Sequence, residues 1–251
     1  MNADPLLEID WRLPRGVRAA FTTRQGGSSR APWDSFNLAV HVGDASADVA
    51  RNRAQLRSLL NLPAEPCWLN QVHGVGVADL DGPGAAAAPV TADAAVARGA
   101  ARVCVVMVAD CLPVLFASRG GTVIAAAHAG WRGLAAGVLE RAVGSTGVPG
   151  GELSAWLGPA ISRAHFEVGD EVRAAFVDAD AAAAESFAMN ANGRWQADLP
   201  GLARRRLRAL GVTDISGGEW CTYADRARFY SHRRDGKGGR MAALIWKDGR
   251  G

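Results

Sequence analysis

Three short segments of this chain place a metal-binding or nucleophilic side chain next to residues that favour turns. They are NQVHG, which carries His73, VADCLP, which carries Cys111, and AAAHAGWRG, which carries His128. Each segment lies at the end of a stretch that we expect to be a strand, and strand ends are where a rigid scaffold presents reactive groups. We therefore take these three side chains as candidate catalytic residues and candidate metal ligands.

The spacing of the three residues suits a catalytic zinc site better than a structural one. A structural zinc site usually contains close pairs such as CxxC or HxxxH, and the sequence has none. Three ligands from separate segments leave a fourth position for water or substrate, and zinc lowers the pKa of a bound water to about 7. Taken singly, a cysteine in an apolar strand is more often a core residue and a histidine a hydrogen-bonding group. The residue types alone therefore leave a structural interpretation open.

The elements around these residues predict a single domain over 1–251, of class α+β with mixed sheets. Several strands precede single helices, which does not fit a regular βαβ alternation. Strands are expected at residues 16–23, 67–73, 74–80, 103–109, 112–117, 122–129, 152–157, 212–216 and 241–246. Helices are expected at residues 48–60, 131–143, 169–178 and 200–210. The alanine-rich stretches 82–90 and 178–185 are expected to be a surface loop and a loose helix end.

The composition is that of a globular protein and argues against nucleic-acid or membrane partners. Hydrophobic residues make up 49% of the chain and charged residues 21%. The 28 basic and 25 acidic residues give a net charge of +3, which is too weak a bias for nucleic acid or an anionic membrane. There is no signal-peptide pattern and no apolar run of membrane-spanning length, and the four cysteines are widely scattered. We expect a cytoplasmic protein with free thiols, whose oligomeric state the sequence leaves open.

Motifs along nearly the whole chain resemble those of the YfiH/YlmD family, also called the DUF152 or laccase-domain family. The matching segments are FTTRQGGSS, SFNLAVHVGD, NQVHG, TADAAV, ADCLPVLF, HAGWRG, GPAIS, FEVG, CTY and FYSHRRDG. The resemblance implies a layered α/β/β/α fold and a cytoplasmic zinc enzyme that phosphorolyses adenosine, inosine and 5′-methylthioadenosine, with adenosine deamination as an additional activity. It also places the family's metal ligands on His73, Cys111 and His128.

Phosphorolysis needs a phosphate held against C1′ of the ribose, and arginines are natural phosphate clamps because the guanidinium fork matches phosphate oxygens. The candidates are Arg24, Arg132, Arg233 and Arg234. Arg24 lies in a glycine-containing turn, where free amides add anion contacts. Arg132 is expected in the first turn of a helix, where the helix N-terminus also favours an anion. Packing against neighbouring carboxylates is the structural alternative.

Amide and carboxylate side chains complete the set of candidates. Asn37 and Gln71 could hold the base and ribose, since an amide donates and accepts at once. Deamination needs a carboxylate that carries protons, for which Asp110 and Glu167 are candidates. Alternation along a strand would send Asp110 to the face opposite Cys111, so Glu167 is preferred.

Three other functions remain as alternatives. Five histidines are too few for a multicopper oxidase, and no residue is placed as the axial ligand of a blue-copper site. Copper can still occupy the site in vitro, because Cu²⁺ generally outcompetes Zn²⁺ for nitrogen and sulfur ligands. Cys111 could instead be a nucleophile activated by an imidazole, in a hydrolase that edits cell-wall precursors, a role to which the family is also linked. A non-enzymatic, metal-stabilised binding protein is the third. Sensitivity to a chelator separates the zinc enzyme from the cysteine hydrolase.

Overall fold

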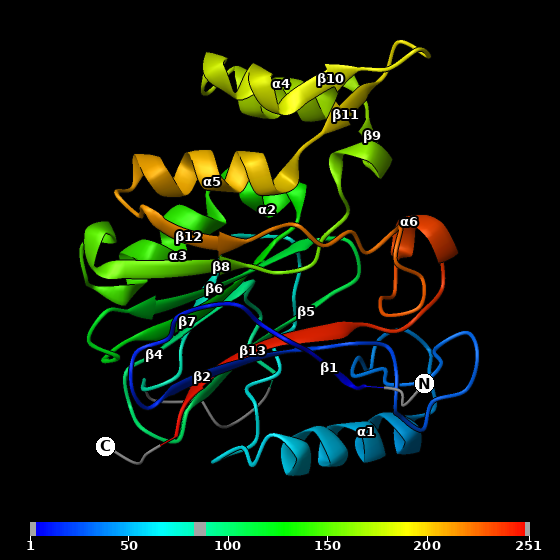
Figure 1. The fold of residues 1–251 in the computed structure, drawn as a ribbon, viewed down its shortest axis with the longest axis vertical. Coiled ribbons are helices and arrows are strands. Elements are labelled where there is room, and N and C mark those ends of the chain that lie inside the picture. Colours follow the sequence, from blue (N-terminus) through cyan, green and yellow to red (C-terminus); the bar gives the residue numbers. More distant parts are fainter. Residues whose placement is uncertain (1–3, 83–88, 249–251) are drawn as a thin grey trace.

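The computed structural model describes residues 4–82 and 89–248, whose strands form two stacked sheets with helices on both outer sides (Figure 1). The four-stranded sheet is antiparallel and has the order β1-β2-β13-β5. Its strands are β1 (Leu6–Leu7), β2 (Val17–Thr22), β13 (Met241–Lys247) and β5 (Val103–Val108). The expected α/β/β/α layering is thus confirmed.

The second large sheet has six strands in the order β12-β8-β6-β7-β4-β3. It is mixed, because the two outer pairs are parallel and the inner pairs antiparallel. Its strands are β12 (Asp214–Gly217), β8 (Leu153–Leu157), β6 (Leu112–Ser118), β7 (Ile124–Ala129), β4 (Ala94–Ala97) and β3 (Val77–Asp79). The chain passes from β5 in one sheet directly into β6 in the other, and Cys111 lies at that crossing.

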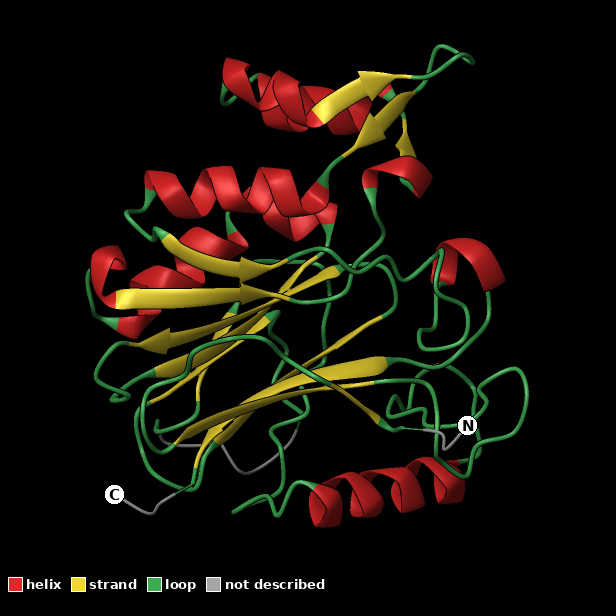
Figure 2. Ribbon diagram, in the orientation of Figure 1, coloured by secondary structure: helices red, strands yellow, loops and turns green. Residues whose placement is uncertain are grey.

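The helices are divided between the two outer faces (Figure 2). One face of the four-stranded sheet is covered by α1 (Ser46–Leu59), and the outer face of the six-stranded sheet by α2 (Trp131–Ala136), α3 (Val138–Thr146) and α5 (Leu199–Ala209). A small sheet of order β10-β11-β9 lies beyond them. The remaining elements are β9 (Glu167–Val168), α4 (Asp170–Val177), β10 (Phe187–Met189), β11 (Trp195–Ala197), α6 (His232–Asp235), and 3₁₀ helices at Gly150–Glu152, Arg163–His165 and Ala181–Ser186.

The continuous apolar runs of the middle of the chain are explained by burial on both faces of the six-stranded sheet. In β6, Val114 and Phe116 pack toward the helices, while Leu115 and Ala117 pack toward the other sheet. A strand that is covered on both sides loses the alternation of polar and apolar residues. The apolar layers above and below this sheet fix the strand ends from which the functional side chains emerge.

Several expectations about elements need correction. The segment 67–73 is not a strand: it makes isolated bridges to Cys104 and Thr91 rather than a ladder. The helix expected at 131–143 is two helices, because Gly137 has φ 98°, in the left-handed region that ends helices. The stretch 178–185 contains a 3₁₀ helix capped by Asp180 rather than a loose helix end. Most of the alanine-rich stretch 82–90 lies outside the described residues.

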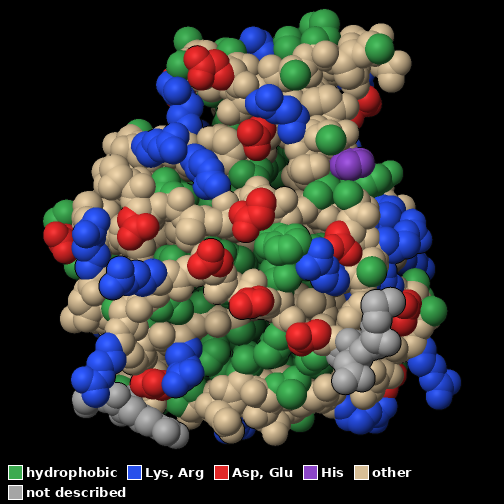
Figure 3. Space-filling view, viewed as in Figure 1, with side chains coloured by type: hydrophobic (Ala, Val, Ile, Leu, Met, Phe, Trp, Pro, Cys, Tyr) green, Lys and Arg blue, Asp and Glu red, His purple; other side chains and the backbone are tan. Residues whose placement is uncertain are grey.

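The surface mixes charges of both signs. On the face shown in Figure 3, basic and acidic side chains are interspersed, and acidic side chains surround a central apolar patch. Within residues 4–82 and 89–248, no helix combines the length and the apolar character needed to cross a membrane.

Candidate metal centre and active site

His73, Cys111 and His128 lie together although they are far apart in the sequence. Their potential ligand atoms are all within 4.8 Å of one another. Sγ of Cys111 lies 3.8 Å from Nε2 of His73, and the two imidazole centroids are 4.8 Å apart. Two imidazole nitrogens and one sulfur are donors that zinc accepts, and three ligands leave a fourth tetrahedral position open. The residues present therefore fit a catalytic zinc ion.

The three side chains are positioned in different ways. Cys111 lies in the turn between β5 and β6, and His128 lies near the end of β7, opposite Pro113 of β6. His73 lies in a loop and has φ 59°, a left-handed conformation that is uncommon for a residue with a side chain. Since the sheet fixes Cys111 and His128, the contacts that hold the His73 loop decide the geometry of the site.

The buried carboxylate of Asp93 holds both histidines. Its Oδ1 accepts hydrogen bonds from the backbone N–H of His73 at 2.9 Å and from Nδ1 of His128 at 2.8 Å. Its Oδ2 accepts the backbone N–H groups of Val72 at 3.2 Å and of Gly74 at 2.7 Å. Burial raises the pKa of Asp93, but the hydrogen bonds from His128 and the amides outweigh it and lower the pKa overall. Because Nδ1 of His128 donates to Asp93, Nε2 is left to bind a metal.

Two glycines of the HAGWRG motif allow the start of α2 to approach the ligands. A Cβ atom on Gly130 would lie 2.9 Å from Sγ of Cys111 and 3.0 Å from Cδ2 of His73. A Cβ atom on Gly133 would lie 2.8 Å from the carbonyl oxygen of Gly74. Any larger residue at either position would displace the ligands or the loop that carries them.

The charges of Cys111 and His128 stabilise each other. Burial opposes ionisation of Cys111, but the charge of His128 and hydrogen bonds from both histidines lower its pKa to about 6. Burial likewise opposes protonation of His128, but the charge of Cys111 and the hydrogen bond to Asp93 raise its pKa to about 9. The lowered pKa favours the thiolate form of Cys111, which is the form that binds metals and acts as a nucleophile.

A pocket of about 230 Å³ opens beside the three ligands. It combines two aromatic rings, three basic side chains, one carboxylate and several apolar groups. Its lining consists of His73, Ala109, Asp110, Cys111, Trp131, Arg132, Ile161, Phe166, Leu199, His232 and Arg233. These residues come from the β5–β6 turn, the starts of α2 and α5, the segment after β8, and α6. A small molecule bound here would touch both the metal ligands and the basic groups.

The premise on which Glu167 was preferred over Asp110, that Asp110 lies on the strand face opposite Cys111, does not hold in the structure. Asp110 has φ 91° and lies in a turn, so strand alternation does not apply, and it lines the pocket beside Cys111. Glu167 is absent from the pocket lining, and its carboxylate accepts a hydrogen bond from Asn190 at 2.7 Å and faces Arg194 at 3.8 Å.

The four arginine candidates divide into two that line the pocket and two that do not. Arg132 and Arg233 line it and are exposed. Arg24 donates to the carbonyl and carboxylate oxygens of Asp34 and lies over the ring of Tyr230. Arg234 is 6% exposed and donates to three backbone carbonyls between residues 222 and 229. Arg24 and Arg234 therefore hold loops together and are not placed as phosphate clamps.

The two amide candidates are also structural. Asn37 is completely buried: its Nδ2 donates to Ala39 and Asp44, and its Oδ1 accepts from the amides of Ala39 and Arg240. Gln71 pairs through both amide atoms with the backbone N–H and carbonyl of Met107, at 2.8 and 2.9 Å. Neither Asn37 nor Gln71 is among the residues that line the pocket beside the metal ligands, so the structure does not bring them together with the other candidates.

Four residues of the site and its pocket were not predicted from the sequence: Asp93, Trp131, Phe166 and His232. Asp93, Trp131 and Phe166 belong to the TADAAV, HAGWRG and FEVG motifs that were quoted for the resemblance, so the motifs carried a signal that residue chemistry alone did not. His232 lies in FYSHRRDG, next to the arginines that were singled out.

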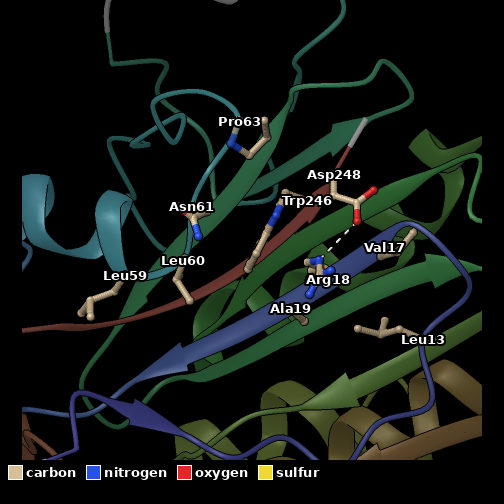
Figure 4. Close-up of a pocket in the computed structure, with 10 residues that line it drawn as sticks. All are labelled: Leu13, Val17, Arg18, Ala19, Leu59, Leu60, Asn61, Pro63, Trp246 and Asp248. Atoms are coloured by element: carbon tan, nitrogen blue, oxygen red, sulfur yellow. Dashed lines mark hydrogen bonds and ion pairs between the residues drawn. The ribbon is translucent and has the colours of Figure 1, made fainter. Parts of the chain in front are cut away.

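A larger cavity of about 630 Å³ lies at the other end of β13, around Trp246 and the end of α1 (Figure 4). Its lining combines apolar side chains with Asn61 and the ion pair between Arg18 and Asp248 at 3.3 Å. No cysteine or histidine is among its lining residues, so size alone does not identify the reactive site.

Comparison with known proteins identifies the family. The family described as multi-copper polyphenol oxidoreductase laccase matches residues 18–248. The chain belongs to this laccase-domain family. A purine nucleoside phosphorylase of Pseudomonas aeruginosa is 53% identical over 247 residues, covering 98% of this chain and 99% of the relative. The purine nucleoside phosphorylase YfiH of Escherichia coli strain K12 is 48% identical, covering 96% of this chain and 98% of the relative.

Solved structures of laccase-domain proteins share this fold. A DUF152 protein of Neisseria meningitidis superposes with a TM-score of 0.94 at 46% identity, covering 98% of this chain and all of that one. YlmD from Geobacillus stearothermophilus gives a TM-score of 0.84 at 30% identity, covering 97% and 99%. The resemblance drawn from the motifs is therefore confirmed.

The family's description as a copper oxidase does not match the residues of this laccase-domain chain. A multicopper cluster needs many imidazoles, and the sequence contains five histidines. Within the part of the chain that the structure describes, His73, Cys111 and His128 are the one group with metal-binding geometry. The site is thus suited to a single metal ion.

Proposed function

We propose that this protein is a zinc-dependent purine nucleoside phosphorylase. Its substrates are adenosine, inosine and 5′-methylthioadenosine, and its products are the free base and ribose 1-phosphate or 5-methylthioribose 1-phosphate. The observation that carries the proposal is one pocket that joins a Cys/His₂ metal site to two arginines and two aromatic rings. The names of relatives at 43–53% identity support the same activity.

Each part of the pocket matches one requirement of phosphorolysis. Arg132 and Arg233 bind the phosphate, because guanidinium groups pair with phosphate oxygens in a bidentate way. Trp131 and Phe166 supply aromatic rings against which a purine can stack, on the faces opposite those covered by the guanidinium groups of Arg132 and Arg233. A phosphate oxygen then forms the bond to C1′ while the bond from C1′ to the purine nitrogen breaks, and the base leaves with that electron pair and gains a proton.

The metal site contributes to this chemistry through His73, Cys111 and His128. When bound there, zinc supplies Lewis acidity, which stabilises negative charge on an oxygen or nitrogen atom close to it. Asp93 keeps the two histidines oriented, and the apolar residues Ile161 and Leu199 limit the access of water, which would compete with phosphate as the nucleophile.

Adenosine deamination at the same site requires a second binding pose. C6 of the purine, rather than C1′, would then have to face the ligands, and Asp110 is the carboxylate in the pocket lining that could carry protons. Phosphorolysis and deamination therefore compete for one pocket, and we propose deamination as the minor activity.

One observation favours a second candidate function. Cys111, His128 and Asp93 form a chain in which the thiolate faces an imidazole and the imidazole is oriented by a buried carboxylate. This is the order of nucleophile, base and orienting group found in cysteine hydrolases. A hydrolase of this kind, acting on a cell-wall precursor, would work without metal.

A phosphate-dependent assay on metal-quantified protein tests the proposal. Adenosine, inosine and 5′-methylthioadenosine are incubated with and without phosphate, beside the Cys111→Ala variant, and the products are separated by chromatography. Formation of base and sugar 1-phosphate, lost in the variant and after chelation and restored by zinc, is expected. Absence of product from stoichiometrically zinc-loaded protein would refute it. Retention of an amide hydrolase activity in chelator would favour the cysteine hydrolase.

A further inference from the structure

Asp110 is held in a strained conformation at the edge of the pocket. Its φ of 91° lies in the left-handed region, which a residue with a side chain rarely adopts, and such residues cluster at functional sites. Its backbone carbonyl accepts the N–H of Ile161 at 2.9 Å, so the turn is fixed to the segment after β8. The strain places the carboxylate on the same side as Cys111, in the lining of the pocket.

Both oxygens of the Asp110 carboxylate accept hydrogen bonds from residues that are distant in the sequence. Oδ1 accepts a hydrogen bond from the hydroxyl of Thr222 at 2.7 Å, and Oδ2 accepts the backbone N–H of Arg233 at 2.7 Å. Thr222 is completely buried, while Asp110 keeps 9% exposure. A carboxylate has about four acceptor sites, so two remain after these bonds. Asp110 is thus a rigid acceptor at the pocket wall.

Apart from the proposed metal ligands, the other polar side chains of the pocket lining are basic, whereas Asp110 is acidic. Arg132, Arg233 and His232 are basic, and Asp110 is the one carboxylate among the described lining residues. Its charge repels phosphate, which leaves the nucleoside as its partner. The three proposed nucleosides differ in their purine groups, and 5′-methylthioadenosine lacks a 5′-hydroxyl. The hydrogen-bond donors that all three share are the 2′- and 3′-hydroxyls of the ribose.

We infer that Asp110 binds the 2′,3′-diol of the ribose and thereby selects ribonucleosides over deoxyribonucleosides. The inference rests on the proposed function. It assigns Asp110 to substrate binding in the phosphorolysis pose, where the carboxylate orients C1′ between the basic groups and the metal ligands. Since a hydrogen bond to a charged group changes an equilibrium by roughly 10- to 100-fold, removal of a bound hydroxyl lowers kcat/KM by a similar factor.

The test compares three nucleosides across three variants with matched metal content. Inosine, 2′-deoxyinosine and 3′-deoxyinosine are used because they cannot undergo adenosine deamination. Asp110→Ala removes the acceptor. Asp110→Asn keeps both anchoring bonds, since its oxygen accepts from Arg233 while the Thr222 hydroxyl reverses and accepts from the new amide. Thr222→Val removes one anchor and leaves the carboxylate in the pocket.

The decisive quantity is the ratio of kcat/KM for inosine to kcat/KM for each deoxy analogue. Dividing the ratio for the wild type by that for a variant cancels the intrinsic lability of the deoxynucleosides. We expect this quotient to be about 10 or more for Asp110→Ala with at least one analogue, smaller for Asp110→Asn, and near 1 for Thr222→Val. Dissociation constants for inosine and its analogues without phosphate should follow the same pattern.

Two outcomes would overturn the inference about Asp110, and a third would overturn the proposed function instead. Equal losses of activity on inosine and on both analogues in Asp110→Ala would show a structural role for Asp110. Dissociation constants of the wild type that are equal for inosine and both deoxy analogues would do the same. A wild-type protein that phosphorolyses no nucleoside would instead refute the proposed function, so the two failures are distinguishable.

Discussion

Replacing Asp93 with asparagine should weaken metal binding and destabilise the fold together. Asparagine keeps one acceptor oxygen and puts an NH₂ group at the other position. Because each oxygen of Asp93 accepts two N–H groups, either orientation of the amide loses two bonds and sets donors against donors. Hydrogen bonds to a charged group are worth about 1.5–3 kcal/mol each, which gives a loss of about 3–6 kcal/mol in the free energy of unfolding.

Relaxation of the loop around His73 should bring the measured loss toward the lower end of that range. Chemical denaturation in the presence of a chelator measures it without a contribution from metal. Competition with a chromophoric chelator measures zinc affinity, which we expect to fall 10- to 100-fold, because Asp93 orients both imidazoles. Asp10→Asn, which removes an exposed carboxylate far from the site, is the matched control and should change stability by less than about 0.5 kcal/mol.

The pH dependence gives an independent check of the same reasoning. The pKa of Asp93 is lowered in the folded protein, so its contribution to stability is present above its ordinary pKa of about 3.9 and is lost as the pH falls through the folded value. The stability difference between wild type and Asp93→Asn should therefore shrink in acid. Because Asp93 also helps raise the pKa of His128 to about 9, the difference should shrink again as the pH rises from about 6.5 toward 9. Unchanged zinc affinity together with unchanged stability in the variant would refute the role assigned to Asp93.

Three further predictions concern the ligands and the pocket. Gly130→Ala should weaken zinc binding by at least about 10-fold, because its Cβ would lie 2.9 Å from Sγ of Cys111. The control Gly144→Ala has no neighbour within 4 Å of its Cβ, so it should be neutral or stabilise α3 by up to about 1 kcal/mol. Metal titration measures the zinc affinity of both variants, and thermal unfolding measures their stability. In chelator-treated protein, the alkylation rate of Cys111 should rise with pH to a plateau, with a midpoint near pH 6. Burial raises the pKa of Cys67, so the alkylation rate of Cys67 should rise only at higher pH. Mass spectrometry of the labelled peptides measures both rates, and the same pH dependence for both thiols would contradict the prediction. Arg233→Ala should raise KM for phosphate by about 10-fold or more with a smaller effect on KM for inosine, and equal effects on both would argue against a phosphate role.

The predicted residues that the structure brings together are those whose chemistry is unusual for their surroundings. A cysteine or histidine at the end of an apolar strand stands out, and His73, Cys111 and His128 were found in this way. The structure places Asn37 and Gln71 outside the pocket lining, which the sequence could not indicate, because an amide that bonds to the backbone and one that binds a ligand look the same in a sequence.

Backbone conformation explains most of the remaining differences. The face on which Asp110 lies depends on its φ of 91°, which alternation does not anticipate. Strand β4 was missed because its sequence, AAVA, is mostly alanine and lacks the β-branched signal of neighbouring strands. The segment 67–73 has that signal and yet forms no ladder, because its contacts are divided between β5 and Thr91. These contacts depend on the tertiary arrangement and not on local preference.

The pairing of Gln71 with Met107 also covers part of a sheet edge and so opposes strand pairing between copies of the protein. Strand β5 is the last strand of its sheet, and an open strand edge can recruit strands from other chains and start aggregation. Here the amide of Gln71 occupies the N–H and carbonyl of Met107, and the backbone N–H of Cys67 occupies the carbonyl of Val103. The segment 67–73, which is not itself a strand, thus occupies the edge of β5 near both of its ends. The segment that carries His73 therefore also opposes aggregation through this edge.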